Sequence, residues 1–220
     1  NVWSDISLVY DSSNNKSVMI YADGNNSNYL TARTVTVNAS TNSMTFGTPV
    51  VLYSALAQYI SSTFDSTNNK VIVTSYTSGA FRCFVGTVSG TSISFGSAVS
   101  ITGGISTYSG LCFDSTNGKV VVAYSNTGNS SKGTAVVGTV SGSSISFGTP
   151  VVFEEAEILR DGGSGNYAQR AVYDSTANRV VVSYQVGTTA QQYGRFVVGQ
   201  VSGTSITFGS AQDYNEGTSR

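Results

Sequence analysis

Short apolar runs separated by turn residues make up most of the chain. In residues 59–101 the runs YISSTF, KVIVTSY, FRCFVGTV and ISFGSAVSI are separated by DSTNN, TSGA and SGTS. Runs of this length between turns rich in Gly, Asn, Asp and Ser predict four β-strands joined by hairpins. The second run is apolar at successive positions, as is VVVAY at 120–124. This pattern is typical of a strand that is buried on both faces.

The same unit occurs four times. An aromatic residue precedes an aspartate at Asp11, Asp65, Asp114 and Asp174, and a Phe-Gly pair follows at 46–47, 95–96, 147–148 and 208–209. The unit is about fifty residues long, which gives repeats of approximately 1–54, 55–103, 104–160 and 161–220. If the two ends of the chain were joined, the Phe-to-Asp interval would be 23 residues, within the range of 19 to 27 seen inside the chain. We therefore expect the two ends to be neighbours.

Four-stranded antiparallel units with their inner strands covered on both faces are the blades of a β-propeller. We predict an all-β fold in which residues 1–220 form a single domain, a β-propeller of four four-stranded antiparallel blades. A solenoid is the rival architecture, but its repeats are usually shorter and its ends need polar caps. If the chain is cut from a longer array, it is part of a larger propeller or repeat array.

The repeated phrase has a structural explanation. The Asp65 carboxylate can accept hydrogen bonds from backbone N–H groups two or three residues further on, and Asn69 or Gly118 can adopt the positive φ that ends such a turn. The Phe-Gly pair is expected to place a packing residue between blades and a bulge in the outer strand. Cys83 and Cys112 are expected to be small core residues.

Composition excludes several functions. Charged residues make up 10% of the chain, the net charge is -1 and no basic tract is present, which argues against nucleic acid as a partner. No apolar run approaches the roughly 20 residues of a membrane span, so we expect no membrane insertion. The chain has no histidine and therefore lacks the commonest general base and metal ligand. We predict no catalytic residues, no metal site and no cofactor.

The loops after the second and fourth strands of each unit vary from repeat to repeat, so this face is where binding is expected. An aromatic residue precedes each innermost strand, and two more lie beside the loops after the second strands. These six candidate ligand-binding residues are Trp3, Tyr29, Tyr59, Tyr108, Tyr167 and Tyr193. Aromatic rings beside hydroxyl and amide groups suit a carbohydrate, because a ring covers the C–H face of a sugar. The alternative is that these rings only pack between blades.

The longest insertion, residues 153–170, carries four carboxylates. They are Glu154, Glu155, Glu157 and Asp161. Paired carboxylates hydrolyse glycosides, but these cluster in one loop, whereas a propeller glycosidase draws its acids from several blades. We interpret the insertion as a solvated loop or an interface.

The stretch KVVVAYSNTGNSSKGTAVVGTVSGSSISFGTPVVF, residues 119–153, resembles repeat-type β-propellers of marine bacterial and phage proteins, including tail-fibre and adhesin-like proteins. All four units share the resemblance. It implies an extracellular or virion-surface location and surface recognition, and it implies no particular ligand and no catalytic residues.

The leading hypothesis is a non-catalytic domain that binds glycans or another surface polymer through its variable loops. The second is a structural module of an extracellular fibre, sheath or virion appendage, with copies of itself or neighbouring fibre domains as partners. A propeller glycosidase is the third, and the missing histidine argues against it.

Overall fold

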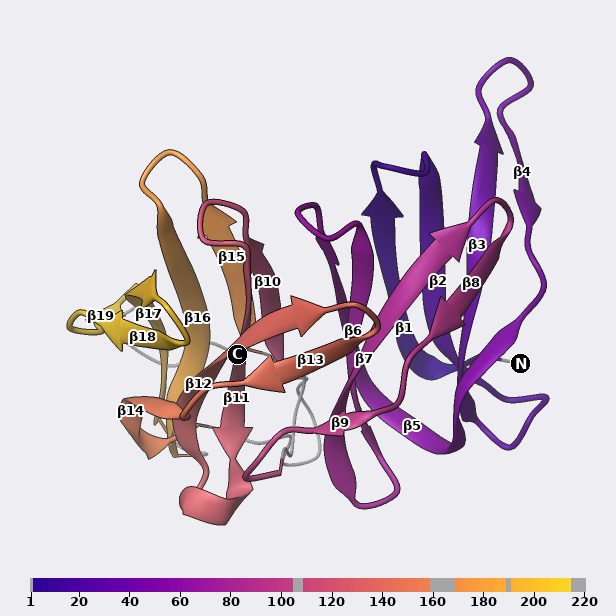
Figure 1. The fold of residues 1–220 in the computed structure, drawn as a ribbon. Coiled ribbons are helices and arrows are strands. Elements are labelled where there is room, and N and C mark those ends of the chain that lie inside the picture. The colour runs from indigo at the N-terminus through magenta and orange to yellow at the C-terminus, as the bar shows by residue number, and fades with distance from the viewer. Residues whose placement is uncertain (1, 105–108, 159–168, 189–190, 215–220) are drawn as a thin grey trace. The chain divides into compact units, whose positions relative to one another are not determined.

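The computed structural model describes residues 2–104, 109–158, 169–188 and 191–214, and these form an all-β protein (Figure 1). Within these ranges the chain has no α-helix; one 3-10 turn, η1, spans Thr127–Asn129. None of the described residues belongs to a helix that is long and apolar enough to cross a membrane. The chain forms two compact units, residues 1–100 with 140–145, and residues 101–139 with 146–220.

The first unit contains two consecutive meanders in one antiparallel sheet. Its strands are β1 (Val2–Asp11), β2 (Lys16–Asp23), β3 (Tyr29–Asn38), β4 (Ser43–Phe46), β5 (Val50–Asp65), β6 (Lys70–Thr77), β7 (Ala80–Ser89), β8 (Ser92–Phe95) and β9 (Val99–Ser100). The sheet order is β1-β2-β3-β5-β6-β7-β8, while β4 pairs with β3 and β9 with β7. The two middle strands predicted for the second repeat are thus present as β6 and β7, each within a few residues of its predicted bounds, and the fourth is split into β8 and β9.

One strand differs from the prediction. β5 continues from the outer edge of the first repeat into the innermost strand of the second, without a break. Its first part pairs with β3 and its second part with β6, and the pairing shifts between Gln58 and Ser61. The apolar pattern predicted two separate strands here. The structure has one continuous strand instead, because a β-bulge bends a strand without interrupting its extended backbone.

The second unit contains two five-stranded antiparallel sheets. Their strands are β10 (Gly110–Asp114), β11 (Lys119–Asn126), β12 (Lys132–Ser141), β13 (Ser144–Phe147), β14 (Val151–Glu157), β15 (Arg170–Asp174), β16 (Arg179–Thr188), β17 (Gln191–Ser202), β18 (Ser205–Phe208) and β19 (Gln212–Asp213). The orders are β10-β11-β12-β13, with β14 on β12, and β15-β16-β17-β18, with β19 on β17. Each sheet repeats the meander of the first unit.

The Phe-Gly pair interrupts the outer strand, as predicted. The outer strand of each repeat consists of two pieces that pair with the same third strand: β4 with the start of β5, β8 with β9, β13 with β14, and β18 with β19. At the break the glycine N–H still donates to the third strand, for example Gly47 to the Thr34 carbonyl at 2.9 Å and Gly148 to the Val137 carbonyl at 2.9 Å. The glycine is therefore a bend in the edge strand.

The aspartate turns have the predicted geometry. The Asp65 Oδ1 atom accepts hydrogen bonds from the backbone N–H groups of Thr67 and Asn68, at 3.0 and 2.9 Å, and its Oδ2 accepts one from the Asn68 amide at 2.8 Å. Asn69 follows with φ 56°. Asp11 and Asp114 make the same contacts with their own turns. The repeated phrase therefore has a local structural role.

Each unit has a hydrophobic core between its two meanders. In the first unit the core joins residues of β2 and β3, such as Ile20 and Leu30, to residues of β6 and β7, such as Val73 and Phe84. In the second unit it joins β11 and β12 to β16 and β17. Cys83 and Cys112 are buried free thiols, as predicted.

Candidate functional site

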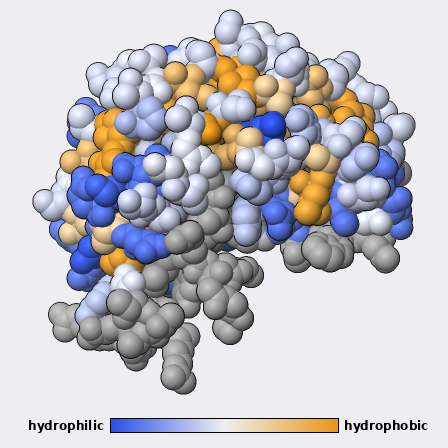
Figure 2. Space-filling view, turned by 90° about the horizontal axis from the view of Figure 1, so that it is seen from below, coloured by the Kyte–Doolittle hydropathy of each residue, from blue (hydrophilic) through white to orange (hydrophobic). Residues whose placement is uncertain are grey.

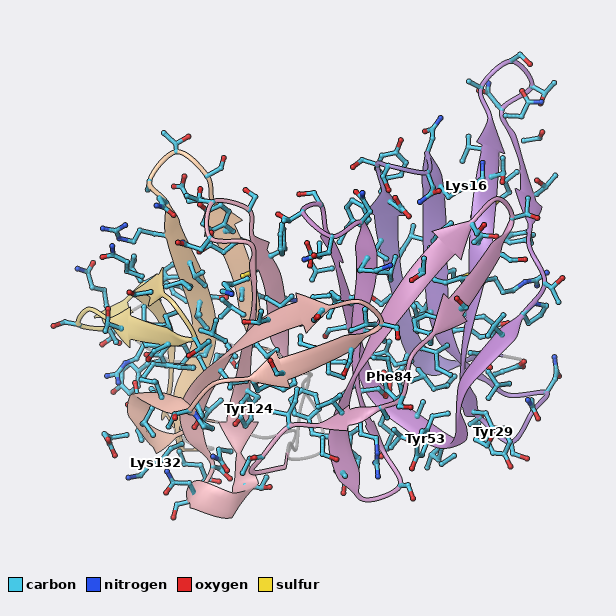
Figure 3. All side chains as sticks on the ribbon, viewed as in Figure 1. Lys16, Tyr29, Tyr53, Phe84, Tyr124 and Lys132 are labelled. Carbon is cyan, nitrogen blue, oxygen red and sulfur yellow. The ribbon has the colours of Figure 1, made fainter. Side chains whose placement is uncertain are left out.

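The aspartate turns and the variable loops lie at opposite ends of the strands. In the first unit, Lys16 follows the Asp11 turn and Tyr29 follows a variable loop, and the two residues lie at opposite ends (Figure 3). We call the end of each unit that carries the variable loops its loop end. In the first unit the loop end consists of residues 24–28, 56–60 and 77–80. In the second unit it consists of residues 101–104, 126–132 and 155–158. Seen from below, the molecule has hydrophobic residues interspersed among hydrophilic ones (Figure 2).

Tyr59 is held in an unusual backbone conformation at the loop end of the first unit. It lies in the β5 bulge with φ 55°, a left-handed conformation that is uncommon for residues other than glycine. The Asp5 carboxylate, which is buried, accepts a hydrogen bond from the Tyr59 N–H at 2.8 Å. Strained residues that the surrounding structure holds in place are concentrated at functional sites.

The half-buried Tyr59 ring lies against a second tyrosine. Its centroid is 6.4 Å from that of Tyr76, and the two rings are tilted by 50°. Tyr76 is also half-buried, at the end of β6. Because both rings keep part of their surface accessible, the pair can offer an aromatic surface to a ligand.

Tyr29 begins β3 beside a well-braced loop. The N–H groups of Asn26 and Asn28 donate to the Asp23 carbonyl at 2.9 and 2.8 Å, and the Ala57 N–H donates to the Asn28 carbonyl at 3.0 Å. Tyr29 is paired with Leu56 of β5, which is exposed. Tyr29 is half-buried and thus also has some accessible surface.

Four side-chain oxygens near the loop end are buried and have no hydrogen-bond partner among the described residues. They are Asn28 Oδ1, Thr77 Oγ1, Asn126 Oδ1 and Gln185 Oε1, one from each repeat. Thr77 and Asn126 are the last residues of β6 and β11, and Asn28 directly precedes β3. Buried polar atoms are normally paired, so the loop end retains hydrogen-bond acceptors that protein groups do not use.

In the second unit the loop before β10 packs closely on η1. The carbonyl of Gly103 accepts hydrogen bonds from Gly128 N–H at 2.8 Å and from Thr127 Oγ1 at 3.0 Å. Gly103 has φ 101°, and a Cβ atom there would lie 2.2 Å from Asn126 Oδ1. The Tyr124 hydroxyl donates to the Thr102 carbonyl at 2.7 Å, and burial raises the pKa of Tyr124 to about 12. These contacts fix Asn126 beside the loop.

The acidic insertion differs from the expected solvated loop, because its first part belongs to strand β14 and Glu154 is buried there, while Asp161 lies outside the described residues. Glu154 is buried and accepts hydrogen bonds from the Arg195 guanidinium at 2.9 Å, the Tyr184 hydroxyl at 3.1 Å and the Ala156 N–H at 2.9 Å. Burial, followed by the Glu154 charge, raises the pKa of Tyr184. Glu155 is exposed, as expected, and pairs with Lys132 at 2.5 Å.

Arg195 completes this network. Its Nε atom donates to Asp213 at 2.5 Å, and that hydrogen bond is the main reason why the pKa of Arg195 is raised. The Glu154 carboxylate is thus neutralised by a cation and fully engaged. It ties β14 to β16 and β17 of the neighbouring repeat, which is a structural role.

The structure describes three of the six predicted ligand-binding side chains. Tyr29 and Tyr59 lie at the loop end of the first unit, and Tyr193 is half-buried in β17, opposite Val186. Trp3 lies in β1 opposite Ala22, but its side chain is outside the described part, as are Tyr108 and Tyr167. Of the four aromatic residues predicted to precede the innermost strands, only Tyr59 therefore has a side chain that the structure describes.

Asp5 and Tyr76 were missed by the sequence analysis. A signal for Asp5 exists, because it lies six residues before Asp11 as Tyr59 lies six before Asp65. An alignment of the repeats by position places these two residues at the same bulge. No comparable signal exists for Tyr76, since its contact with Tyr59 depends on the strand pairing.

The described residues contain no group of three or more Asp, Glu or Cys side chains arranged to hold a metal ion. No known protein family matches the sequence. No curated protein sequence matches it either.

Proposed function

We propose that the protein is a non-catalytic recognition domain that binds a neutral glycan, or a similar hydroxyl-rich surface polymer, at its loop end. The observation that carries the proposal lies in the first unit, where two unpaired side-chain oxygens, Asn28 Oδ1 and Thr77 Oγ1, are at the same end of the strands as the half-buried rings of Tyr29 and Tyr59. An unpaired acceptor is satisfied by a donor, and sugar hydroxyls are donors. A neutral ligand fits a protein with few charges and a net charge of -1.

Aromatic side chains supply the second element of the proposed site. Tyr59 and Tyr76 form an accessible pair, and Tyr29 and Tyr193 are half-buried. A ring that covers the C–H face of a sugar, beside amides and hydroxyls that bind its hydroxyl groups, is a typical carbohydrate-binding arrangement. In this proposal Trp3, Tyr108 and Tyr167 contribute the corresponding rings of the other repeats.

The absence of catalysis is part of the proposal. The chain has no histidine, and the one buried glutamate of the acidic insertion, Glu154, is engaged by Arg195, Tyr184 and a backbone N–H. A general acid needs access to the substrate, and the buried Glu154 carboxylate is occupied by these hydrogen bonds. We assign binding alone to the loop end.

The proposed architecture is a four-bladed β-propeller, with each four-stranded meander as one blade. Four copies of one meander support it, since each copy has the same strand order and the same broken outer strand. We place the domain outside the cell or on a virion surface, where recognition of a surface polymer would be useful.

Binding of the protein to an immobilised glycan array and to dextran, mannan and cellulose tests the proposed function. We expect binding to at least one neutral polymer, and at least a tenfold weaker affinity for Thr77→Val and Tyr59→Asn. Lys16→Ala, at the opposite end of the first unit, is the control and should bind normally. Absence of binding to every polymer, or equal losses in all three variants, would refute the proposal.

A structural module of a fibre is the second candidate. It is favoured by exposed large apolar side chains in the first and fourth repeats, including Val37, Met44, Phe196 and Val198. If these surfaces join separate copies, the protein forms polymers whose length rises with concentration. Light scattering during gel filtration over a hundredfold range of concentration distinguishes this candidate from a monomeric recognition domain.

A further inference from the structure

Two arginines occupy the same position of the third strand, Arg82 in β7 of the second repeat and Arg195 in β17 of the fourth. Arg82 is paired with Ser100 of β9, and Arg195 is paired with Asp213 of β19. Both arginines are half-buried. Each unit contains one of them, so the surroundings of the two side chains can be compared position by position.

The arginine of the second unit is neutralised by two carboxylates. Arg195 Nη1 lies 2.9 Å from Glu154 Oε2, and Arg195 Nε lies 2.5 Å from Asp213 Oδ1. The hydroxyl of Tyr184, which is paired with Arg195 across β16 and β17, also donates to Glu154. The charge of this arginine is therefore compensated within its own unit.

In the first unit, neutral residues stand at all three of these positions. They are Tyr53 in place of Glu154, Ser100 in place of Asp213 and Ser75 in place of Tyr184. The Arg82 guanidinium carbon lies 4.7 Å from the centroid of the Tyr53 ring, and such a ring attracts a cation without neutralising it. Arg82 accordingly forms no ion pair with any residue that the structure describes.

The Arg82 side chain is held in place and still has unused donors. Its Nη1 atom donates to the carbonyls of Thr77 and Ala80, the latter at 3.3 Å. In the described part of the chain, no acceptor is bonded to Arg82 Nε or Nη2. These two atoms form an edge of the guanidinium that can bind both oxygens of a carboxylate. Because the group is already fixed, it loses little conformational freedom when a ligand binds.

Arg82 is the one cation near the loop end of the first unit, among the residues that the structure describes. Tyr53, over which its guanidinium lies, is at this end of the strands (Figure 3). The other cations of the unit follow the aspartate turns, as Lys16 and Lys70 do, or lie beside the Phe-Gly bend, as Arg33 does. A single cation suits a ligand with one carboxylate better than a peptide segment with many acidic side chains.

We propose that Arg82 anchors a site for a sugar acid, that is, a sugar with one carboxylate and several hydroxyl groups, free or as a unit of a polymer. The carboxylate of the ligand binds the Nε and Nη2 edge and replaces the carboxylates that Arg195 has within its own unit. Ser100 is exposed and paired with Arg82, so its hydroxyl is placed to hydrogen-bond to the sugar hydroxyls.

This site is separate from the aromatic pair at the same end of the unit. Tyr59 and Tyr76 lie on the first and second strands of the second repeat, whereas Arg82 and Ser100 lie on its third and outer strands. The inference therefore does not rest on the binding of a neutral glycan at Tyr59.

Titration of the isotope-labelled protein with sodium glucuronate tests the site, with galactose as the neutral comparison. The NMR signals of the arginine Nε–H groups report binding, and the variant Arg82→Gln identifies the signal of Arg82. We expect glucuronate to shift this signal and galactose to leave it unchanged. We also expect the protein to bind polygalacturonate.

Two variants remove the site in different ways. Arg82→Gln removes the cation, and Ser100→Asp keeps the cation but supplies the internal carboxylate that Arg195 has in Asp213. Each should weaken binding of glucuronate and of polygalacturonate at least tenfold. Lys16→Gln is the matched control, because it removes the same charge at the opposite end of the first unit, and its affinity should stay within twofold of that of the parent protein.

Four results would overturn the proposal. The first is that glucuronate leaves the Arg82 signal unchanged, and the second is that Ser100→Asp binds as tightly as the parent protein. The third is equal weakening by all three variants, which would show that only the net charge matters. The fourth is that polyglutamate binds as tightly as polygalacturonate, in which case the site takes carboxylates of proteins. None of these results bears on neutral polymers, whose binding is measured separately with Tyr59→Asn.

Discussion

Replacement of Asp114 by alanine should destabilise the protein much more than the same change at Asp174. Asp114 is buried and accepts hydrogen bonds from Thr116 N–H at 3.1 Å, Asn117 N–H at 3.0 Å and the Asn117 amide at 2.8 Å. Asp174 is exposed and accepts only from Thr176 N–H and Ala177 N–H, each at 2.9 Å. Both residues lie in the second unit, so the two variants report on the same folded body.

The magnitude follows from the number and exposure of these bonds. Loss of a side chain that caps backbone N–H groups costs about 1 kcal/mol when water can replace it, which is the expectation for Asp174→Ala. Hydrogen bonds to a charged group contribute about 1.5–3 kcal/mol each, but the freed turn N–H groups are partly rehydrated. We therefore expect Asp114→Ala to cost about 2–4 kcal/mol, which corresponds to a decrease in melting temperature of roughly 5–15 °C for a protein of this size.

Guanidinium unfolding followed by tryptophan and tyrosine fluorescence measures both variants. Asp65→Ala in the first unit is an independent repetition of Asp114→Ala, because its carboxylate makes the same three contacts. Equal destabilisation by Asp114→Ala and Asp174→Ala would refute the argument from burial and bond number. A folded Asp114→Ala variant that has lost affinity for calcium would show that the repeated phrase has a binding role as well.

Three further predictions are open to direct measurement. Ala177→Asn should stabilise the protein by about 0.5–1.5 kcal/mol, because asparagine at this position of the other turns donates to the aspartate, and thermal unfolding reports it. Burial raises the pKa of Cys83 from its ordinary 9.0 to about 12, so the unfolded state releases this proton first and the Cys83 contribution to stability should fall by about 1.4 kcal/mol per pH unit between those values. Cys83→Ala should lower the slope of unfolding titrations at pH 8 to 11 by this amount and leave the contribution of Cys112, whose pKa burial also raises to about 12. Tyr59→Asn should change stability by less than about 1 kcal/mol, since asparagine tolerates a positive φ, whereas Tyr59→Phe should keep both stability and binding if the ring supplies the contact.

Local sequence signals predicted the strands and turns well. The aspartate turn, the positive φ of Asn69 and the bend at Gly47 all depend on residues within a few positions of each other. The requirement is local in each case, since a carboxylate two residues before a free N–H, or a residue without a side chain, favours one backbone conformation. These features recur in every repeat because each repeat contains the same local sequence.

Contacts between distant residues could not be predicted in the same way. Glu154 is buried and accepts a hydrogen bond from Arg195, which lies 41 residues further along the sequence. The nearby residues Glu155 and Glu157 are exposed. The contact between Tyr59 and Tyr76 likewise depends on how β5 pairs with β6 across the bulge. For the candidate site, the sequence therefore indicated that aromatic residues contribute and that the site lies at the variable-loop end of the strands. It did not identify Asp5, Tyr76 or the unpaired oxygens.

The exposure of Phe46 shows why repeat position matters as much as residue type. The Phe-Gly pattern predicted a packing residue in all four repeats, and Phe95, Phe147 and Phe208 are indeed half-buried. Phe46 is exposed, with the Arg33 guanidinium 5.0 Å from its ring centroid. The prediction is wrong for this residue, whereas Phe208 of the fourth repeat packs against Phe153 of the third, with ring centroids 5.3 Å apart. Phe46→Ser should therefore cost little stability in thermal unfolding, whereas Phe208→Ser should destabilise the protein as a core substitution does.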